Sequence, residues 1–148
     1  MIVVTGAAGF IGYNIAKRLN LMGFKDLILL DDKEKFPNPK KFLNLEYRDY
    51  RHYNNLSDLK NIEFVFHEGA CSDTMEYNRD YMMEINFEYS KKIFEIAKMN
   101  ESKFIYASSA AVYGLNQDSE EISVNESPLN IYAESKLLFD KYIMSQDY

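Results

Sequence analysis

A glycine-rich turn near the amino end constrains the fold of this 148-residue chain more than any other feature. The turn, Gly6-Ala-Ala-Gly9-Phe-Ile-Gly12, follows a β-branched run over residues 2–5 and opens a segment with helical periodicity. Its spacing is one residue longer than the G-x-G-x-x-G pattern of dinucleotide-binding turns. Small residues let such a backbone approach a pyrophosphate at the helix amino terminus. The pattern predicts a strand, a phosphate-binding turn and a helix; the alternative is a tight connection that binds nothing.

Short apolar runs alternate with segments of helical period along the rest of the chain. Predicted strands cover residues 2–5, 27–30, 62–67 and 103–107, with a weaker one within 45–50. Predicted helices cover residues 10–22, 80–99 and 131–145, with a helical turn at 56–60 and a loop at 33–44. Strands that alternate with helices form right-handed βαβ units. The sequence therefore predicts one α/β domain over residues 1–148, with a doubly wound parallel sheet of the Rossmann type.

Composition narrows the class of protein and of partner. With 47% hydrophobic and 27% charged residues, the chain has the composition of a globular protein. A formal net charge of −6 disfavours nucleic acids and anionic membranes as partners. The sequence shows no signal peptide and no run of about 18 apolar residues, and Cys71 is its single cysteine. We therefore expect a cytoplasmic protein without disulfides and without a metal site.

Two acidic residues, Asp31 and Asp32, follow the second predicted strand, about 20 residues beyond the last glycine of the turn. An acidic residue at this point binds the ribose hydroxyls of the adenosine half of a dinucleotide. The alternative is an aspartate that only solvates a strand end. Two carboxylates repel a 2′-phosphate and favour NAD, whereas the lysines that follow favour NADP: Lys33, Lys35, Lys40 and Lys41.

Tyr132 and Lys136 lie four residues apart at the start of the last predicted helix, on one face. A free phenol is a poor base at neutral pH because its pKa is about 10, but a neighbouring ammonium favours the phenolate. A chain with 12 tyrosines is expected to contain such a pair by chance, and we assign the second pair, Tyr13 and Lys17, to helix packing. Ser108-Ser109 favours Tyr132, because it follows the fifth predicted strand, where ligands of open α/β sheets bind. The alternative is a serine-rich strand end that caps a turn.

Several stretches together resemble the extended short-chain dehydrogenase/reductase superfamily, the nucleotide-sugar epimerases and dehydratases. They cover residues 1–12, 41–45, 66–72, 81–83, 106–114 and 128–140. The glycine turn and the Tyr132/Lys136 pair are shared across the superfamily. The stretches at 41–45 and 66–72 are similar to the branch that epimerises C6 of an ADP-heptose for the lipopolysaccharide core. The resemblance implies a redox-neutral reaction, in which a bound nicotinamide takes hydride from the side-chain carbinol carbon of the heptose and returns it from the other face.

The resemblance also implies roles for individual residues. The implied catalytic residues are Ser109, Tyr132 and Lys136, and Lys136 would also bind the nicotinamide ribose. The implied cofactor-binding residues are Gly6, Gly9, Phe10, Ile11, Gly12, Asp31, Asp32, Lys41, Glu68, Gly69, Ala70, Cys71, Ser72 and Asn86. Lys41 matches a family lysine that meets the 2′-phosphate, so NADP is expected, with NAD possible. Cys71 is then a small residue of a cofactor loop and not a nucleophile, and His67 is a packed strand-end histidine.

Length is where the sequence departs from this superfamily. The resemblance covers the whole chain but only the first half of the family's length, so we expect the last strand or strands and the substrate domain to be absent. A truncated reading frame and an isolated domain are both open interpretations. The expected function is epimerisation of an ADP-heptose, or another epimerase or dehydratase reaction on a nucleotide sugar, in a full-length form that is a homo-oligomer. The alternative is a non-catalytic dinucleotide-binding module.

Overall fold

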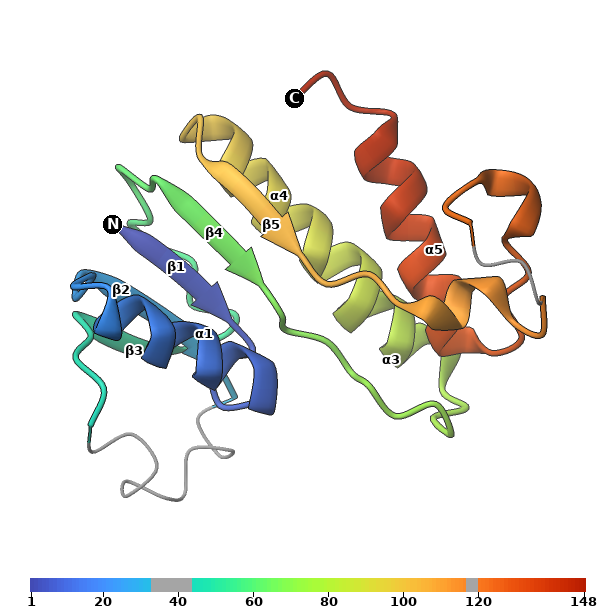
Figure 1. Ribbon diagram of the computed structural model, residues 1–148, viewed down its shortest axis with the longest axis horizontal. Coiled ribbons are helices and arrows are strands. Elements are labelled where there is room, and N and C mark those ends of the chain that lie inside the picture. The colour runs from blue at the N-terminus through green and yellow to red at the C-terminus, as the bar shows by residue number, and fades with distance from the viewer. Residues whose placement is uncertain (33–43, 117–119) are drawn as a thin grey trace. The chain divides into compact units, whose positions relative to one another are not determined.

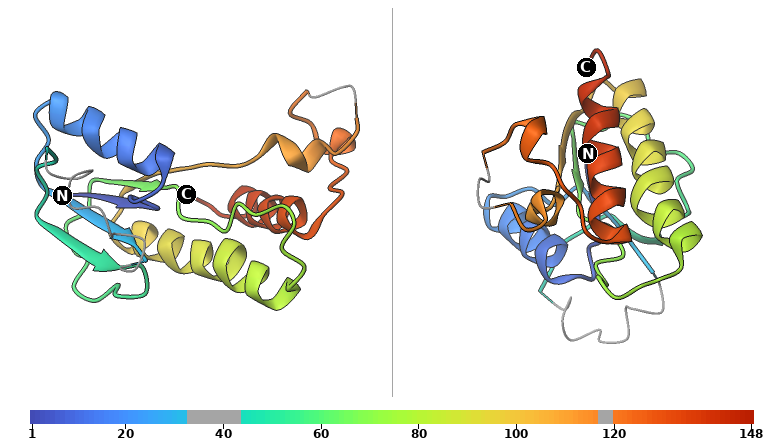
Figure 2. Two further views of the ribbon diagram at one scale, coloured as in Figure 1. Left: turned by 90° about the horizontal axis from the view of Figure 1, so that it is seen from below. Right: turned by 90° about the vertical axis from the view of Figure 1, so that its right-hand side faces the viewer.

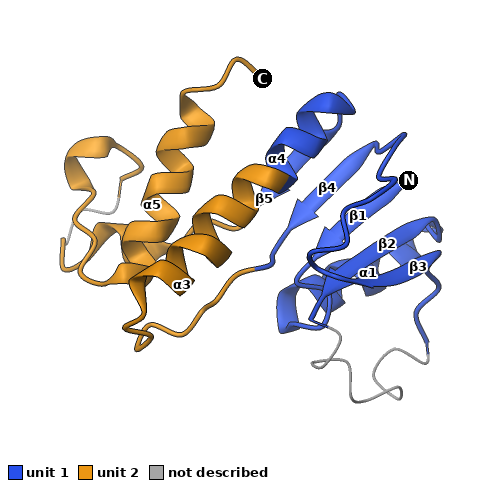
Figure 3. Cartoon of the chain, turned by 180° about the vertical axis from the view of Figure 1, so that it is seen from behind, with its two compact units in different colours: residues 1–69, 93–106 blue, residues 70–92, 107–148 orange. Residues whose placement is uncertain are grey.

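The structure is a computed structural model that describes residues 1–32, 44–116 and 120–148. The chain divides into two compact units, which Figure 3 shows in different colours. Unit 1 comprises residues 1–69 and 93–106 and contains the β-sheet, whereas unit 2 comprises residues 70–92 and 107–148 and is mainly helical. The helix α4 (Tyr89–Met99) contributes residues to both units.

Unit 1 is built on a parallel five-stranded sheet with the strand order β3-β2-β1-β4-β5 (Figure 1). The strands are β1 (Ile2–Thr5), β2 (Leu27–Asp31), β3 (Asp49–His52), β4 (Phe64–His67) and β5 (Lys103–Tyr106). Every residue of β1 is buried, as a continuous apolar run in the middle of a parallel sheet requires. The strand order confirms the predicted doubly wound fold, and the turn after β1 begins at the centre of the sheet.

Helices cover both faces of the sheet in unit 1 (Figure 2). The helix α1 (Phe10–Leu21) lies on one face, and residues 93–99 of α4 lie on the other. Ala16 and Leu19 of α1 belong to a buried cluster that also contains apolar residues of β1 and β2. On the other face, the ring of Phe94 meets the ring of Phe104 edge-on, with centroids 5.3 Å apart. The neighbouring strands β1 and β2 are therefore buried by apolar side chains on both faces.

The described residues of unit 2 contain a helical run, two 3₁₀ helices and a final α-helix. The run begins with α3 (Arg79–Met83), continues as the π-helix η2 (Glu84–Glu88) and passes into α4. The 3₁₀ helices are η3 (Ala110–Tyr113) and η4 (Ser123–Asn125), and the final helix is α5 (Ile131–Met144). Asparagine side chains cap two helices: Asn78 accepts a hydrogen bond from an N–H of α3, and Asn130 from an N–H of α5.

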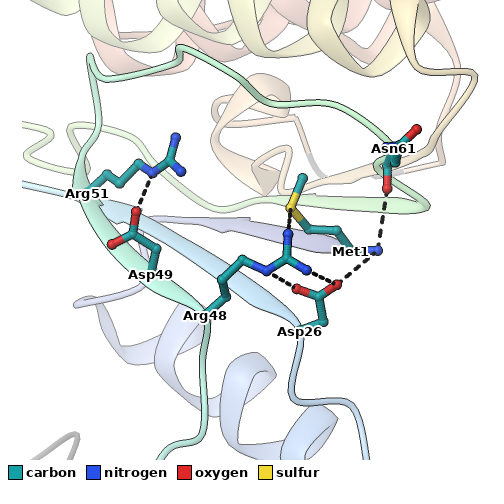
Figure 4. Close-up of polar contacts among 6 residues, drawn as sticks. All are labelled: Met1, Asp26, Arg48, Asp49, Arg51 and Asn61. Atoms are coloured by element: carbon teal, nitrogen blue, oxygen red, sulfur yellow. Dashed lines mark hydrogen bonds and ion pairs between the residues drawn. The ribbon is translucent and has the colours of Figure 1, made fainter.

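Polar contacts connect the amino ends of the strands in unit 1 (Figure 4). Arg48, just before β3, donates to the carboxylate of Asp26, just before β2, from Nε at 2.7 Å and from Nη2 at 2.9 Å. The amino group of Met1 lies 3.7 Å from the same carboxylate and also donates to the carbonyl of Asn61. The positive charges of Arg48 and the Met1 amino group are thus paired with the negative charge of Asp26. Ligands of parallel α/β sheets bind at the carboxyl ends of the strands. The functional residues of unit 1 are therefore expected at the opposite ends of the strands from these contacts.

The third strand and a helical turn differ from the sequence predictions. The strand predicted within residues 45–50 forms later, at Asp49–His52. The reason is Asn20, whose side chain accepts from the N–H of Glu46 and donates to its carbonyl, so that these groups are not available for strand pairing. The helical turn predicted at 56–60 does not form, because Asp58 has a φ of 59°, which a right-handed helix excludes.

The long helix also differs in its interior. It was predicted over residues 80–99 as one α-helix, and the structure has a helical run from Arg79 to Met99 with the π segment η2 inside it. A π segment adds a residue to the helical turn and rotates the side chains that follow it. The other predicted helices and strands agree to within two residues, and the loop predicted at 33–44 lies almost entirely outside the described residues.

Candidate functional site

The turn after β1 has the close backbone contacts that its glycines predict. Gly6 has a φ of +63°, and a Cβ atom on it would lie 2.7 Å from the backbone of Glu68. A Cβ atom on Gly12 would lie 2.3 Å from the carbonyl oxygen of Gly6. Real Cβ atoms do not approach backbone atoms so closely. Both positions therefore require glycine for the turn to form.

The amino end of α1, which follows this turn, has no capping side chain. Gly9 is its N-cap residue, and the first turn of the helix contains no acidic residue. The side chains of Phe10 and Ile11 are exposed. The first N–H groups of a helix have no partner within the helix, and the positive end of the helix dipole attracts an anion. The arrangement fits a pyrophosphate, which the N–H groups of residues 10–12 would hold.

Asp31 connects the end of β2 to the glycine turn. Its Oδ2 accepts a hydrogen bond from the N–H of Ala8 at 2.8 Å, and its Oδ1 accepts from the N–H of Asp32 at 2.7 Å. A carboxylate has about four acceptor sites, so Asp31 retains the capacity to accept from a ribose hydroxyl. Lys41, which was predicted to meet a 2′-phosphate, lies outside the described residues, as do the other lysines between 33 and 40.

Tyr50 of β3 lies beside these two carboxylates. Its hydroxyl donates to the carbonyl of Asp32 at 2.8 Å. Burial, together with the charges of Asp31 and Asp32, raises the pKa of Tyr50 above its usual range. The phenol therefore remains a hydrogen-bond donor at neutral pH and supports the backbone at the end of β2.

The loop after β4 is held to the end of β1 by Thr5. The Thr5 hydroxyl oxygen accepts from the N–H groups of Glu68 at 3.1 Å and Gly69 at 2.9 Å, and it lies 2.7 Å from Nδ1 of His67. His67 is buried, which agrees with the predicted packed strand-end histidine. Sequence reasoning missed Thr5, although a polar residue at the end of an apolar strand was a usable signal.

In unit 2, Asn86 holds the loop that continues from residue 70. Its Oδ1 accepts from the N–H of Cys71 at 2.8 Å, and its Nδ2 donates to the carbonyl of Cys71 at 3.0 Å. The same amide nitrogen lies 3.0 Å from the hydroxyl of Ser135 on α5. Asn86 is buried and lies in the middle of η2. It therefore links the loop of Ala70, Cys71 and Ser72 to α5, and its direct contact with a cofactor stays a prediction.

Tyr132 and Lys136 lie in the first two turns of α5, where Lys136 is buried and Tyr132 is half-buried. Ser109 caps η3 through its side chain, and η3 packs against α5. The neighbouring Ser108 donates its hydroxyl to Oδ2 of Asp140 at 2.5 Å, one helical turn beyond Lys136. Unit 2 therefore brings the two serines to the helix that carries Tyr132. Sequence reasoning did not single out Asp140, although its i, i+4 spacing from Lys136 was a signal.

The competing pair, Tyr13 and Lys17, lies in α1. Tyr13 is half-buried and packs against the hydrophobic cluster between α1 and the sheet, which agrees with its assignment to packing. In the described part of the chain, no group of three His, Cys, Asp or Glu side chains could hold a metal ion. Among those residues, no helix has the length and apolar character needed to cross a bilayer.

The parallel sheet and the glycine turn define the class of protein: a Rossmann-type domain that fits a dinucleotide. Residues 2–147 match the model of the NAD dependent epimerase/dehydratase family, and the chain belongs to this family. The predicted superfamily is thereby confirmed. The chain is 44% identical over 152 residues to ADP-L-glycero-D-manno-heptose-6-epimerase of Brachyspira hyodysenteriae, and the match covers 97% of this chain and 48% of that protein.

Solved structures give the same result for the fold. The structure is similar to that of ADP-L-glycero-D-manno-heptose-6-epimerase from Helicobacter pylori, with a TM-score of 0.83 and 31% identity over 97% of this chain and 50% of that chain. It is also similar to UDP-glucuronic acid 4-epimerase from Bacillus cereus in complex with NAD, with a TM-score of 0.78 and 25% identity over 97% of this chain and 51% of that chain. The chain therefore spans about half the length of the relatives it matches.

Proposed function

We propose that residues 1–148 form the nicotinamide-binding domain of an epimerase that acts at C6 of an ADP-heptose. The observation that carries this proposal is the uncapped amino end of α1 next to a turn that excludes side chains at Gly6 and Gly12. The 44% identity to a heptose epimerase supports the choice of sugar. That relative is about twice as long as this chain. The sugar substrate and the complete reaction are therefore proposed for the full-length protein.

The proposed chemistry rests on three side chains of unit 2. Hydride transfer from the carbinol carbon of the sugar, and back to the opposite face of the same carbon, is the chemistry that a bound nicotinamide would supply. Tyr132 takes the proton of the reacting hydroxyl and later returns it. Lys136, one turn further along α5, binds the nicotinamide ribose and carries a positive charge on the same face of the helix as Tyr132. Ser109 donates a hydrogen bond to the substrate oxygen and so orients the hydroxyl toward Tyr132.

For the cofactor we propose NADP, with NAD as the competitor. The carboxylates of Asp31 and Asp32 favour NAD, and the lysines that follow them in the sequence, Lys41 above all, favour NADP. Parallel fluorescence titrations of the chain with NADPH and NADH measure this preference directly. Tighter binding of NADPH is expected, and tighter binding of NADH would reverse the assignment.

The proposed setting follows from the same reaction. An ADP-heptose is a precursor of the lipopolysaccharide core, so we propose that the enzyme works in the cytoplasm, where activated sugars are made. We also propose that the full-length form is a homo-oligomer. For residues 1–148 alone we expect little or no turnover. The expected substrate domain is not part of this stretch, and a substrate must be held in position for hydride transfer to be fast.

The function is tested with the chain fused to the second half of the Helicobacter pylori relative and supplied with the ADP-heptose. Tyr132→Phe removes the proposed acid–base group and is expected to lower turnover by about 10²–10⁴-fold while nicotinamide binding persists. Tyr13→Phe is the matched control and should retain turnover. Loss of turnover in Tyr13→Phe but not in Tyr132→Phe would contradict the proposed roles. NADPH binding without any turnover in the fusion would favour the non-catalytic dinucleotide-binding module.

A further inference from the structure

His67 and Thr5 are a buried polar pair at the carboxyl ends of two neighbouring strands. Thr5 ends β1 and His67 ends β4, and the two residues are paired in the register of the sheet. Thr5 is 0% and His67 is 2% exposed. The Thr5 oxygen and His67 Nδ1 lie 2.7 Å apart, so one of the two groups donates a hydrogen bond to the other.

The other contacts of Thr5 decide the direction of this bond. A threonine hydroxyl has one donor proton and two acceptor lone pairs. The N–H groups of Glu68 and Gly69 both donate to the Thr5 oxygen and occupy both lone pairs. The remaining interaction of the hydroxyl is the donation of its own proton. His67 Nδ1 must therefore be the acceptor, which requires a neutral imidazole with its proton on Nε2.

The hydrogen bond between Thr5 and His67 affects the loop after β4, because the Thr5 hydroxyl binds the first residues of that loop. Glu68 and Gly69 begin the loop after β4, and a Cβ atom on Gly6 would lie within 2.8 Å of the backbone atoms of both. A Cβ atom on Gly69 would lie 3.0 Å from the Thr5 oxygen. The glycine turn and the loop therefore touch backbone to backbone, and the Thr5 hydroxyl fixes their spacing.

We propose that His67 is a positioning residue for the dinucleotide site. Its neutral Nδ1 fixes the orientation of the Thr5 hydroxyl, so that both lone pairs face the loop, and thereby keeps Glu68 and Gly69 against the glycine turn. A proton on Nδ1 would put two donors face to face and release the loop. This inference rests on the proposed function for the identity of the ligand, and on the hydrogen bonds of unit 1 for the mechanism.

An aromatic ring, apolar side chains and two titratable residues surround His67. Phe104 of β5 stacks on the imidazole with centroids 6.0 Å apart. Tyr106, which is paired with His67 in the register of β5, and Glu68, which follows it in the chain, are the neighbouring titratable residues. The buried residues of α4 in unit 1 are Ile93, Phe94 and Ala97, which carry no charge.

The first test reads the imidazole itself. The chain has two histidines, so a ¹⁵N-histidine spectrum contains two rings, and His52→Asn assigns them. We expect His67 to show an unprotonated Nδ1 and a protonated Nε2. A proton on Nδ1 at neutral pH would overturn the proposal, whether or not the chain binds a nucleotide.

The second test measures the loop and the ligand in matched variants. Thr5→Val and His67→Leu should each weaken binding of NAD⁺ by about tenfold or more in calorimetric titrations and speed amide exchange of Gly69. Thr5→Ser keeps the hydroxyl, and His67→Asn supplies an amide oxygen at the place of Nδ1, so both should restore most of the affinity and the protection. Protection and affinity as in the wild type for His67→Leu would overturn the proposal.

The pH profile separates positioning from simple packing. NAD⁺ has no group that titrates between about pH 5 and 8, the range of histidine, so a change in its affinity there reports on the protein. Affinity of the wild type should fall as the pH is lowered, the profile of His67→Asn should be flat, and His52→Asn should keep the wild-type profile. A slope that persists in His67→Asn would overturn the proposal. If the wild type binds no nicotinamide nucleotide, the proposed function fails, and the ring spectrum and the Gly69 exchange still decide the role of His67.

Discussion

The glycines of the turn after β1 differ in what a side chain would meet. At Gly12 a Cβ atom would lie 2.3 Å from a backbone oxygen, whereas at Gly9 the nearest contact would be 3.1 Å. Gly9 also has a φ of −71° and a ψ of 172°, an extended backbone that any residue adopts. Glycine is therefore needed at position 12 for the turn to form, whereas glycine at position 9 keeps space free at the amino end of α1.

Substitution of these two glycines should separate stability from binding. Gly12→Ala should lower the free energy of unfolding by about 1–3 kcal/mol, because the added methyl group overpacks the turn. Gly9→Val should lower it less than Gly12→Ala does, because its Cβ atom would lie 3.1 Å and not 2.3 Å from the Gly6 carbonyl oxygen, but should abolish NADPH binding by filling the space for a pyrophosphate. Urea unfolding and NADPH fluorescence measure the two effects. Unchanged affinity in Gly9→Val would contradict the proposed phosphate site.

Among the elements of unit 2, α3 and α5 are joined by an ion pair near Tyr132. Two guanidinium nitrogens of Arg79 donate to the two carboxylate oxygens of Glu134, at 2.5 and 2.6 Å. These hydrogen bonds hold the pKa of the Glu134 carboxyl below its usual range. The side chains of Arg79 and Glu134 are 53% and 37% exposed, so solvent and salt screen the attraction and its contribution to stability is small.

The lowered pKa of Glu134 fixes how this contribution depends on pH. A carboxyl whose pKa is lower in the folded state stabilises the fold above its unfolded pKa, about 4.3, and the stabilisation is lost as the pH falls through the folded value. Glu134→Gln should therefore be slightly less stable than the wild type at neutral pH and equal to it in strong acid. Urea unfolding at several pH values measures the difference. Arg79→Gln should abolish the effect of Glu134→Gln, and additive losses would contradict coupling through this pair.

Elements whose residues carry a local pattern could be predicted, and contacts between distant residues could not. The strand β1 was predicted residue for residue because it is a continuous apolar run that needs burial on both faces. The strand β3 was misplaced because its sequence, DYRH, is polar and half-buried and has no alternation. The glycine turn was visible as a spacing. The bond of Thr5 to Gly69 connects residues that only the folded sheet brings together, so no local pattern encodes it.

At the scale of the whole molecule, β5 is an edge of the sheet. In the described residues it pairs with β4 and with no other strand. The sequence of β5, KFIY, is rich in strand-forming apolar residues, and Ile105 is 46% exposed. An apolar edge strand offers unpaired N–H and C=O groups to other chains, and natural proteins commonly block such edges with charge.

The isolated chain should therefore self-associate through β5 and be only marginally soluble. Ile105→Lys places a charge on this edge and should shift the population toward monomer, because pairing of two β5 strands would bring like charges together. Ile122→Lys is the matched control: Ile122 is 48% exposed but lies outside the sheet, just before η4, so this variant should associate like the wild type. Sedimentation velocity over a range of concentrations measures the distribution. A wild-type chain that remains monomeric throughout, or an equal effect of the two lysines, would show that the β5 edge does not drive association.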